Sequence, residues 1–174
     1  MYIHSVKNGH VVAKPELTKS LSYKVVEKKK KIKKEFQNLS GKEIAAIANE
    51  KGREFLTNEV SNVLIGYSGD TPVEDYNRWD NTKILIHEAT FLTKEDGLRN
   101  DANKHSNLEE VMEMVASIQI EKLILSHFST RYSKEEIDQA ILKNCKAYNI
   151  KIPIHRILPG EVCRDILNEK PFNG

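Results

Sequence analysis

The stretch from Asn62 to Thr71, NVLIGYSGDT, constrains the fold of this chain more than any other feature. Val63, Leu64 and Ile65 form a short apolar run bounded by turn residues, which is typical of a buried strand. Two glycines then permit a tight reversal, so that Asp70 lies just beyond the carboxyl end of the strand, where open α/β sheets place functional groups. An aspartate after glycine is also a common turn former or helix cap, and alone it does not distinguish the two roles.

Two later segments repeat this pattern of an apolar run that ends in acid/base side chains. The run KILIHE ends in His87 and Glu88, and the run KLILSH ends in His127. His105 lies between the two runs, directly before a predicted helix, where a lone histidine is often a cap or a surface group. Side chains of these types at corresponding ends of one sheet are difficult to explain by packing, so they indicate a functional cluster.

Predicted helices alternate with these strands. Ser40 and Ser133 each precede a glutamate three residues later, which is the pattern of a capping box. Ser106 and Glu109 repeat the pattern after His105, and we expect that helix to begin there. Its inward face is predicted to consist of apolar residues at helical spacing: Leu108, Val111, Met112 and Val115. Together with a last strand over residues 152–158, this alternation predicts an α/β fold.

Length and composition limit the possible classes of protein. The chain has 174 residues, 39% of them hydrophobic and 30% charged, which suits one cytoplasmic domain with a real core. No stretch approaches the ~18 apolar residues of a membrane helix, so we expect no membrane association. Cys145 and Cys163 have neither a CxxC partner nor zinc-site spacing, and we interpret them as reduced structural thiols.

The charge of the chain is concentrated in one segment. The net charge of +2 is too small to imply a nucleic-acid partner, but residues 28–34 contain six lysines in seven positions. Such a run can be a solvated helical face. It can equally be an arm that contacts phosphates, because ammonium groups neutralise phosphates and release counterions without reading sequence.

Four motifs carry a resemblance to a known family. In order along the chain they are YSGDT at 67–71, HEATF at 87–91, HS at 105–106 and HFSTRY at 127–132. This series resembles the second half of ribonuclease Z, the tRNA 3′-processing endonuclease of the metallo-β-lactamase superfamily. The segment KKEFQNLSGKEI at 33–44 also resembles the part that precedes the Gly-Asp-Thr motif in the short, plant-like and bacterial branch.

The resemblance implies a fold more specific than α/β. Residues 1–174 would form a single, partial metallo-β-lactamase-like domain, the second half of the αββα sandwich, with one mixed sheet and flanking helices. Residues 27–60 would form a basic arm and helix inserted before the Gly-Asp-Thr motif. Because the two sheets of the sandwich pack face to face, half of it would leave one apolar sheet face uncovered.

The resemblance also implies roles for the site residues. In the family two zinc ions share a hydroxide that attacks a phosphodiester of precursor tRNA. Asp70 would bridge the two metals and His127 would hold one of them. His105, oriented by Glu88, would help to protonate the leaving 3′ oxygen. The lysines expected to guide the tRNA are Lys31, Lys33 and Lys34.

The chain departs from the family in its metal ligands. The first half of the family domain carries an HxHxDH motif, and no HxH or DH pair occurs in this sequence. A further zinc-binding histidine of the family lies a few residues before Tyr23; that place holds Glu16, which is either a substitute ligand or a surface acid, while His10 lies too far back in sequence. Because a catalytic zinc ordinarily needs three protein ligands, we expect the isolated chain to hold zinc weakly and to cleave little.

Several possibilities remain open at this point. A complementary amino-terminal half, a second copy of the chain or a rearranged core would cover the bare sheet face. The first function is a ribonuclease Z-type enzyme that needs such completion. The alternatives are a non-catalytic half-domain for RNA binding or assembly, and another hydrolase of the metallo-β-lactamase fold.

Overall fold

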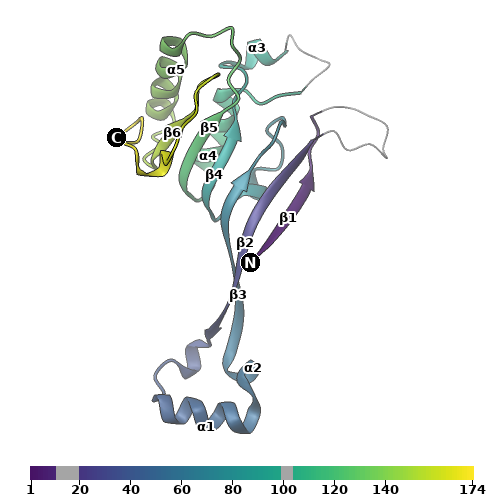
Figure 1. Ribbon diagram of the computed structural model, residues 1–174, viewed down its shortest axis with the longest axis vertical. Helices are drawn as coiled ribbons and strands as arrows, with labels where there is room; N and C mark the ends of the chain where they lie inside the picture. Colours follow the sequence, from purple (N-terminus) through teal and green to yellow (C-terminus); the bar gives the residue numbers. More distant parts are fainter. Residues whose placement is uncertain (11–19, 99–103) are drawn as a thin grey trace.

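The computed structural model describes residues 1–10, 20–98 and 104–174, and in these ranges it contains one six-stranded mixed sheet in the order β1 to β6 (Figure 1). The first three strands are antiparallel, and β3 to β6 are parallel. The strands are β1 (Tyr2–Lys7), β2 (Leu21–Ile32), β3 (Thr57–Tyr67), β4 (Thr82–Glu88), β5 (Ile120–Ser126) and β6 (Ile154–Arg156). The helices are α1 (Gly41–Lys51), α2 (Arg53–Leu56), α3 (Lys94–Leu98), α4 (Leu108–Ser117) and α5 (Lys134–Ala147). The predicted α/β fold with one mixed sheet and flanking helices is confirmed.

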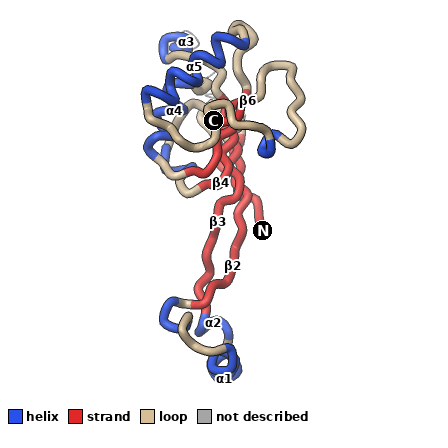
Figure 2. Tube along the Cα trace, turned by 90° about the vertical axis from the view of Figure 1, so that its left-hand side faces the viewer, coloured by secondary structure: helices blue, strands red, loops and turns tan. Residues whose placement is uncertain are grey.

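The parallel strands follow one another in sequence order, and this order decides where the helices lie. Right-handed crossovers that always step to the next strand in the same direction return over the same face of the sheet. α4 and α5 accordingly lie on one face (Figure 2). The core forms between that face and the helices. It includes Leu85, Leu123 and Leu125 from the strands and Val111, Met112, Ile137 and Ile141 from the helices, all nearly or fully buried.

The opposite face of the sheet is less covered. Because side chains alternate along a strand, Ile84 and Ile86 point away from the helices that Leu85 contacts. Tyr23 pairs with Tyr67 on that face, beside Ile86, and the two tyrosines are 38% and 45% exposed. This face therefore presents aromatic and aliphatic side chains without a second layer over all of them.

β2 and β3 extend beyond the other strands and carry α1 and α2 at their far end (Figure 1). We call this hairpin with its two helices, residues 27–60, the arm. The lysine run is not a helical face, because residues 28–32 are paired in register with β3. Lysines on this strand meet acids across the hairpin, with Lys28 bound to Glu59 and Lys30 to Glu54. Tertiary pairing thus replaces the helix that lysine favours locally.

The first residues of the helices show where local sequence predicts the N-cap correctly and where it does not. The capping boxes at Ser40 and Ser133 are both present. α4, in contrast, begins one residue later than predicted: Asn107 is its N-cap and accepts a hydrogen bond from the Glu110 backbone. Ser106 instead donates to the Thr71 carbonyl at 2.6 Å. The Ser106 hydroxyl thus binds a distant segment of the chain instead of capping α4 as the local pattern had predicted.

Among the described residues, no helix is both long enough and apolar enough to cross a membrane. Cys145, which is buried, and Cys163 are free cysteines in the structure.

We expect Gly66→Ala to destabilise the protein. An added Cβ would lie 2.8 and 3.0 Å from ring atoms of the buried Trp79 and 3.2 Å from Leu85 Cδ1. Overpacking of this kind lowers the free energy of unfolding by about 1–3 kcal/mol. Gly41→Ala is the matched control, because nothing lies within 4 Å of its added Cβ. Equal midpoints of urea denaturation for the two variants would contradict the close packing of Gly66 on Trp79.

Candidate metal centre

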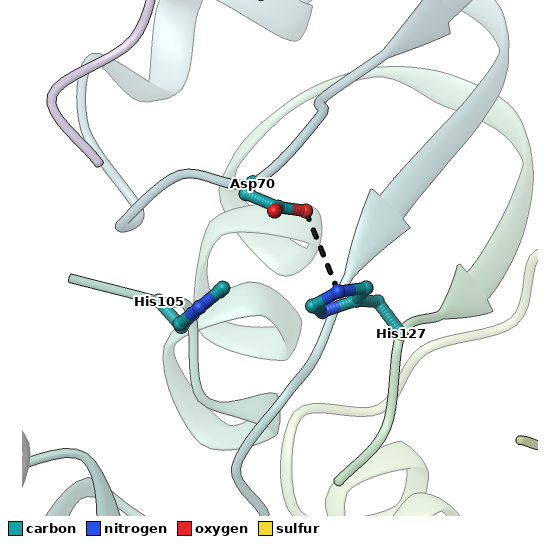
Figure 3. A group of neighbouring side chains, drawn as sticks. All are labelled: Asp70, His105 and His127. Atoms are coloured by element: carbon teal, nitrogen blue, oxygen red, sulfur yellow. Dashed lines mark ion pairs between the residues drawn. The ribbon is translucent and has the colours of Figure 1, made fainter. Parts of the chain in front are cut away.

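Three predicted site residues from distant parts of the chain come together at one edge of the sheet. Asp70 follows β3, His127 follows β5 and His105 precedes α4; one ligand atom from each lies within 4.8 Å of the other two (Figure 3). His127 Nε2 is 3.6 Å from Asp70 Oδ1, and the rings of His105 and His127 stack with centroids 5.3 Å apart. The side chains of Asp70 and His127 are about half exposed, so a substrate or ion can reach them.

The turn that presents Asp70 is held by both its backbone and its neighbours. Gly69 has φ of 59°, and a Cβ at this position would overlap the backbone at the start of β2. Asn8 Nδ2 donates to the carbonyl oxygens of Ser68 at 2.7 Å and Asp70 at 3.3 Å. Ser20 Oγ donates to the Asp70 carbonyl at 2.6 Å. The amino-terminal segment therefore fixes the loop that carries the carboxylate.

His127 is held in an uncommon backbone conformation. Its φ is 61°, in the left-handed region that non-glycine residues occupy at a cost of order 1–3 kcal/mol. The residue persists there because its surroundings determine it: His127 Nδ1 is 2.8 Å from Thr90 Oγ1. Strained residues of this kind cluster at functional sites.

Glu88 is the buried carboxylate behind the two histidines. It is 2% exposed and accepts hydrogen bonds from His105 Nδ1 at 2.9 Å, the Thr71 backbone at 2.7 Å and Thr90 Oγ1 at 2.6 Å. Burial raises the pKa of Glu88, but the hydrogen bonds from His105 and Thr90 outweigh it, and the pKa is lowered. The hydrogen bond between Glu88 and His105 also raises the pKa of His105, although burial of the ring acts in the opposite direction.

His10, which lies too far back in sequence for the family's upstream ligand position, contacts His105 in the structure. Its ring lies edge-on to the ring of His105, with centroids 4.4 Å apart, and its Nδ1 is 2.9 Å from the Lys104 carbonyl. A histidine that donates Nδ1–H to a carbonyl leaves Nε2 free for a metal or a proton. His10 reaches this place because Asn8, two residues before it, binds the turn that carries Asp70. Glu16, the alternative candidate, lies outside the described residues.

The structure does not bring the predicted RNA-contacting lysines to this centre. Lys31, Lys33 and Lys34 lie towards the far end of the arm, whereas the candidate metal ligands lie in the body (Figure 1). Lys31 and Lys34 are exposed, and Lys33 Nζ is 5.4 Å from the ring of Phe55. Any substrate that contacts both regions must be long.

The donor set of the centre fits zinc. Neutral imidazole is a good zinc ligand, and a carboxylate can bind one cation or bridge two. Asp70, His105 and His127 supply these donors in one place, and His10 adds an imidazole beside them. The second imidazole, backed by a buried carboxylate, can instead hold and release a proton.

Sequence comparison identifies the relatives of this chain. It is 33% identical over 130 residues to the chloroplastic tRNase Z of Arabidopsis thaliana, a match that covers 71% of this chain and 36% of that protein. It is 36% identical over 112 residues to the ribonuclease Z of Methanocaldococcus jannaschii, covering 59% and 34%. The chain is similar to part of ribonuclease Z. The predicted resemblance to a part of that protein is confirmed, and the chain spans little more than a third of the length of these two ribonuclease Z relatives.

Structural comparison gives weaker likenesses. A long-form RNase Z from yeast superimposes with a TM-score of 0.43 at 22% identity, covering 76% of this chain and 14% of that one. The metallo-β-lactamase fold protein YhfI from Bacillus subtilis gives 0.46 at 16% identity, covering 82% and 50%. Scores of this size add nothing to the relationship with ribonuclease Z that the sequences establish. No family model matches the chain.

We expect Glu88→Gln to lower the pKa of His105, because the substitution removes the carboxylate that raises it. The raised folded-state pKa means that His105 contributes stability below its unfolded pKa of about 6.5 and loses it as the pH rises through the folded value. NMR titration of the His105 ring measures the shift. Glu135→Gln, which removes an exposed carboxylate in the first turn of α5, is the control. An unchanged His105 titration in Glu88→Gln would show that the pair is not coupled.

Proposed function

We propose that this chain is part of a zinc-dependent endoribonuclease of the ribonuclease Z type, which hydrolyses a phosphodiester at the 3′ end of precursor tRNA. The observation that carries the proposal is the convergence of Asp70, His105 and His127 within 4.8 Å. The names of the sequence relatives support the same reaction class, since both are RNase Z or tRNase Z proteins. A cluster of a carboxylate and imidazoles at a sheet edge has no packing explanation.

The residues of the centre divide into two roles in this proposal. Asp70 and His127 would hold the metal, and His105 would donate a proton to the leaving 3′ oxygen. Zinc at such a site supplies Lewis acidity and a water nucleophile near neutral pH. Glu88 keeps His105 in position and favours its protonated form, which is the form that a general acid needs.

We further propose that this chain works with a complementary half that carries HxHxDH, or with another copy that covers its open sheet face. The motif does not occur in this sequence, and the donors present fall short of the set that two metal ions need. The face with Tyr23, Tyr67 and Ile86 supports the proposal: the two tyrosines are exposed and Ile86 is half-buried beside them. Burying such apolar surface under a second layer would stabilise the assembly.

The arm is proposed to bind the tRNA away from the cleavage site. Lys31, Lys33 and Lys34 carry positive charge at a distance from the metal centre, which suits a partner with a long phosphate backbone. Phosphate contacts of this kind set the position of the RNA without reading its sequence.

We expect Asp70→Ala to abolish metal binding and cleavage in the completed protein. The chain would be combined with a polypeptide that carries the HxHxDH motif. Zinc content of about two ions per assembly and cleavage of precursor tRNA should both require Asp70, because it is the one carboxylate in the ligand cluster. Metal-free wild-type protein that still binds tRNA would contradict the enzyme and favour the RNA-binding module. Metal-dependent hydrolysis of small esters without tRNA cleavage would favour the other hydrolase.

We expect the triple variant Lys31→Ala, Lys33→Ala, Lys34→Ala to weaken tRNA binding and to reduce its salt dependence. Each lost phosphate contact makes the slope of log affinity against log salt less steep by about 0.9, so the triple variant should change it by about 2–3. The matched control changes three exposed lysines of the body: Lys143, Lys146 and Lys151. Equal effects of the two triple variants would mean that the arm contributes only net charge.

A further inference from the structure

Thr90 lies behind the metal centre and contacts three of its members. The residue is 9% exposed, and its Oγ1 is 2.6 Å from Glu88 Oε2, 2.8 Å from His127 Nδ1 and 3.3 Å from His105 Nδ1. Its backbone is fixed on both sides, since its carbonyl accepts from the Ser129 N–H at 3.0 Å and its own N–H donates to Glu88 at 3.3 Å. The hydroxyl therefore has a defined place and a defined set of neighbours.

The number of protons in this cluster decides the direction of each hydrogen bond. Glu88 receives donors from the Thr71 backbone, the Thr90 backbone and His105, which is the environment of an ionised carboxylate. A carboxylate has no proton to give, so the hydroxyl of Thr90 must donate its single proton to Glu88, its nearest partner. The oxygen of Thr90 is then left with lone pairs only.

The direction of this hydrogen bond determines which ring nitrogen of His127 carries the proton. Its Nδ1 can form a hydrogen bond at 2.8 Å with an acceptor only by carrying a proton itself. A neutral imidazole with its proton on Nδ1 has a lone pair on Nε2. That atom is the one that lies 3.6 Å from Asp70 Oδ1, on the open side of the site.

We propose that Thr90 is a positioning residue that selects the Nδ1–H tautomer of His127 and so turns the Nε2 lone pair towards Asp70. This inference rests on the proposed role of His127 as a metal ligand, because only a metal or a proton makes use of that lone pair. Thr90 also holds the ring of a residue whose backbone occupies the left-handed region, with φ of 61°. Both the electronic state and the orientation of the ligand are thereby set before a metal arrives.

Three substitutions of Thr90 test whether its hydroxyl is required. Thr90→Val keeps the shape and removes the hydroxyl, Thr90→Ala removes it without the added methyl group, and Thr90→Ser restores it. Thr82→Val is the matched control: Thr82 Oγ1 is also buried, but among the described residues it has no hydrogen-bond partner. Circular dichroism and thermal unfolding establish that each variant folds. Should Thr90→Val fail to fold, Thr90→Ala supplies the same comparison.

The first readout is the tautomer of His127 in metal-free protein, from long-range ¹H–¹⁵N correlation spectra of the labelled chain at mildly alkaline pH. Wild type, Thr90→Ser and Thr82→Val should show the proton on Nδ1. Thr90→Val and Thr90→Ala should lose that preference. Retention of the Nδ1–H tautomer in both hydroxyl-free variants would overturn the proposal, as would its loss in Thr82→Val.

The second readout is metal affinity, from titration with Co²⁺ followed by visible absorption. Loss of a residue that orients a metal ligand typically costs about 10- to 100-fold in affinity, and we expect Thr90→Val to fall in this range while Thr90→Ser stays near wild type. A tautomer that depends on Thr90 in a wild-type protein that binds no Co²⁺, alone or completed, would support the role of Thr90 and overturn the metal role of the site. Unchanged Co²⁺ affinity in Thr90→Val would overturn the role of Thr90 and leave the metal site standing.

Discussion

The carboxylate of Glu88 is withdrawn from water at the carboxyl end of β4, and the rest of the site is arranged around its negative charge. Its oxygens collect donors from the turn after β3, from the loop before α4 and from Thr90 on its own segment. Removing one partner of a buried charge typically costs about 3–5 kcal/mol, because the other charge is left uncompensated. This requirement brings distant segments to one point, and the candidate metal ligands lie on their outer side.

The order of the strands explains why the side chains of Asp70 and His127, beside the buried Glu88, are accessible to solvent. Parallel strands that step in one direction place α4 and α5 on the same face, so the core lies on that side and the loops at the carboxyl ends stay free of it. The same order leaves the face with Tyr23 and Tyr67 less covered. The open face and the open site thus have one cause.

The molecule separates two tasks in space. The body concentrates acid/base and ligand side chains within a few ångströms, while the arm carries lysines on an extended hairpin away from them. Chemistry needs short distances and restricted geometry, whereas attraction of a polyanion needs only charge along its length. A long polyanion that spans both parts would use the arrangement fully.

Local sequence determined the features that depend on neighbours along the chain. The strand and glycine turn before Asp70, the capping boxes at Ser40 and Ser133 and the apolar stripe of α4 all follow from short-range sterics and hydrogen bonds. The sequence also indicated Asp70, Glu88, His105 and His127 as a cluster, because the ends of parallel strands meet at one edge.

Contacts between distant segments decided the rest. The lysine run is a strand because β3 pairs with it, and Ser106 does not cap α4 because its hydroxyl donates to the Thr71 carbonyl. His10 reached the site because Asn8 binds the turn at Ser68 and Asp70. The sequence did not indicate the proposed positioning role of Thr90, because the role of a threonine hydroxyl depends on the groups that surround it in the folded protein. Separation along the chain says nothing of these distances, which only the folded structure determines.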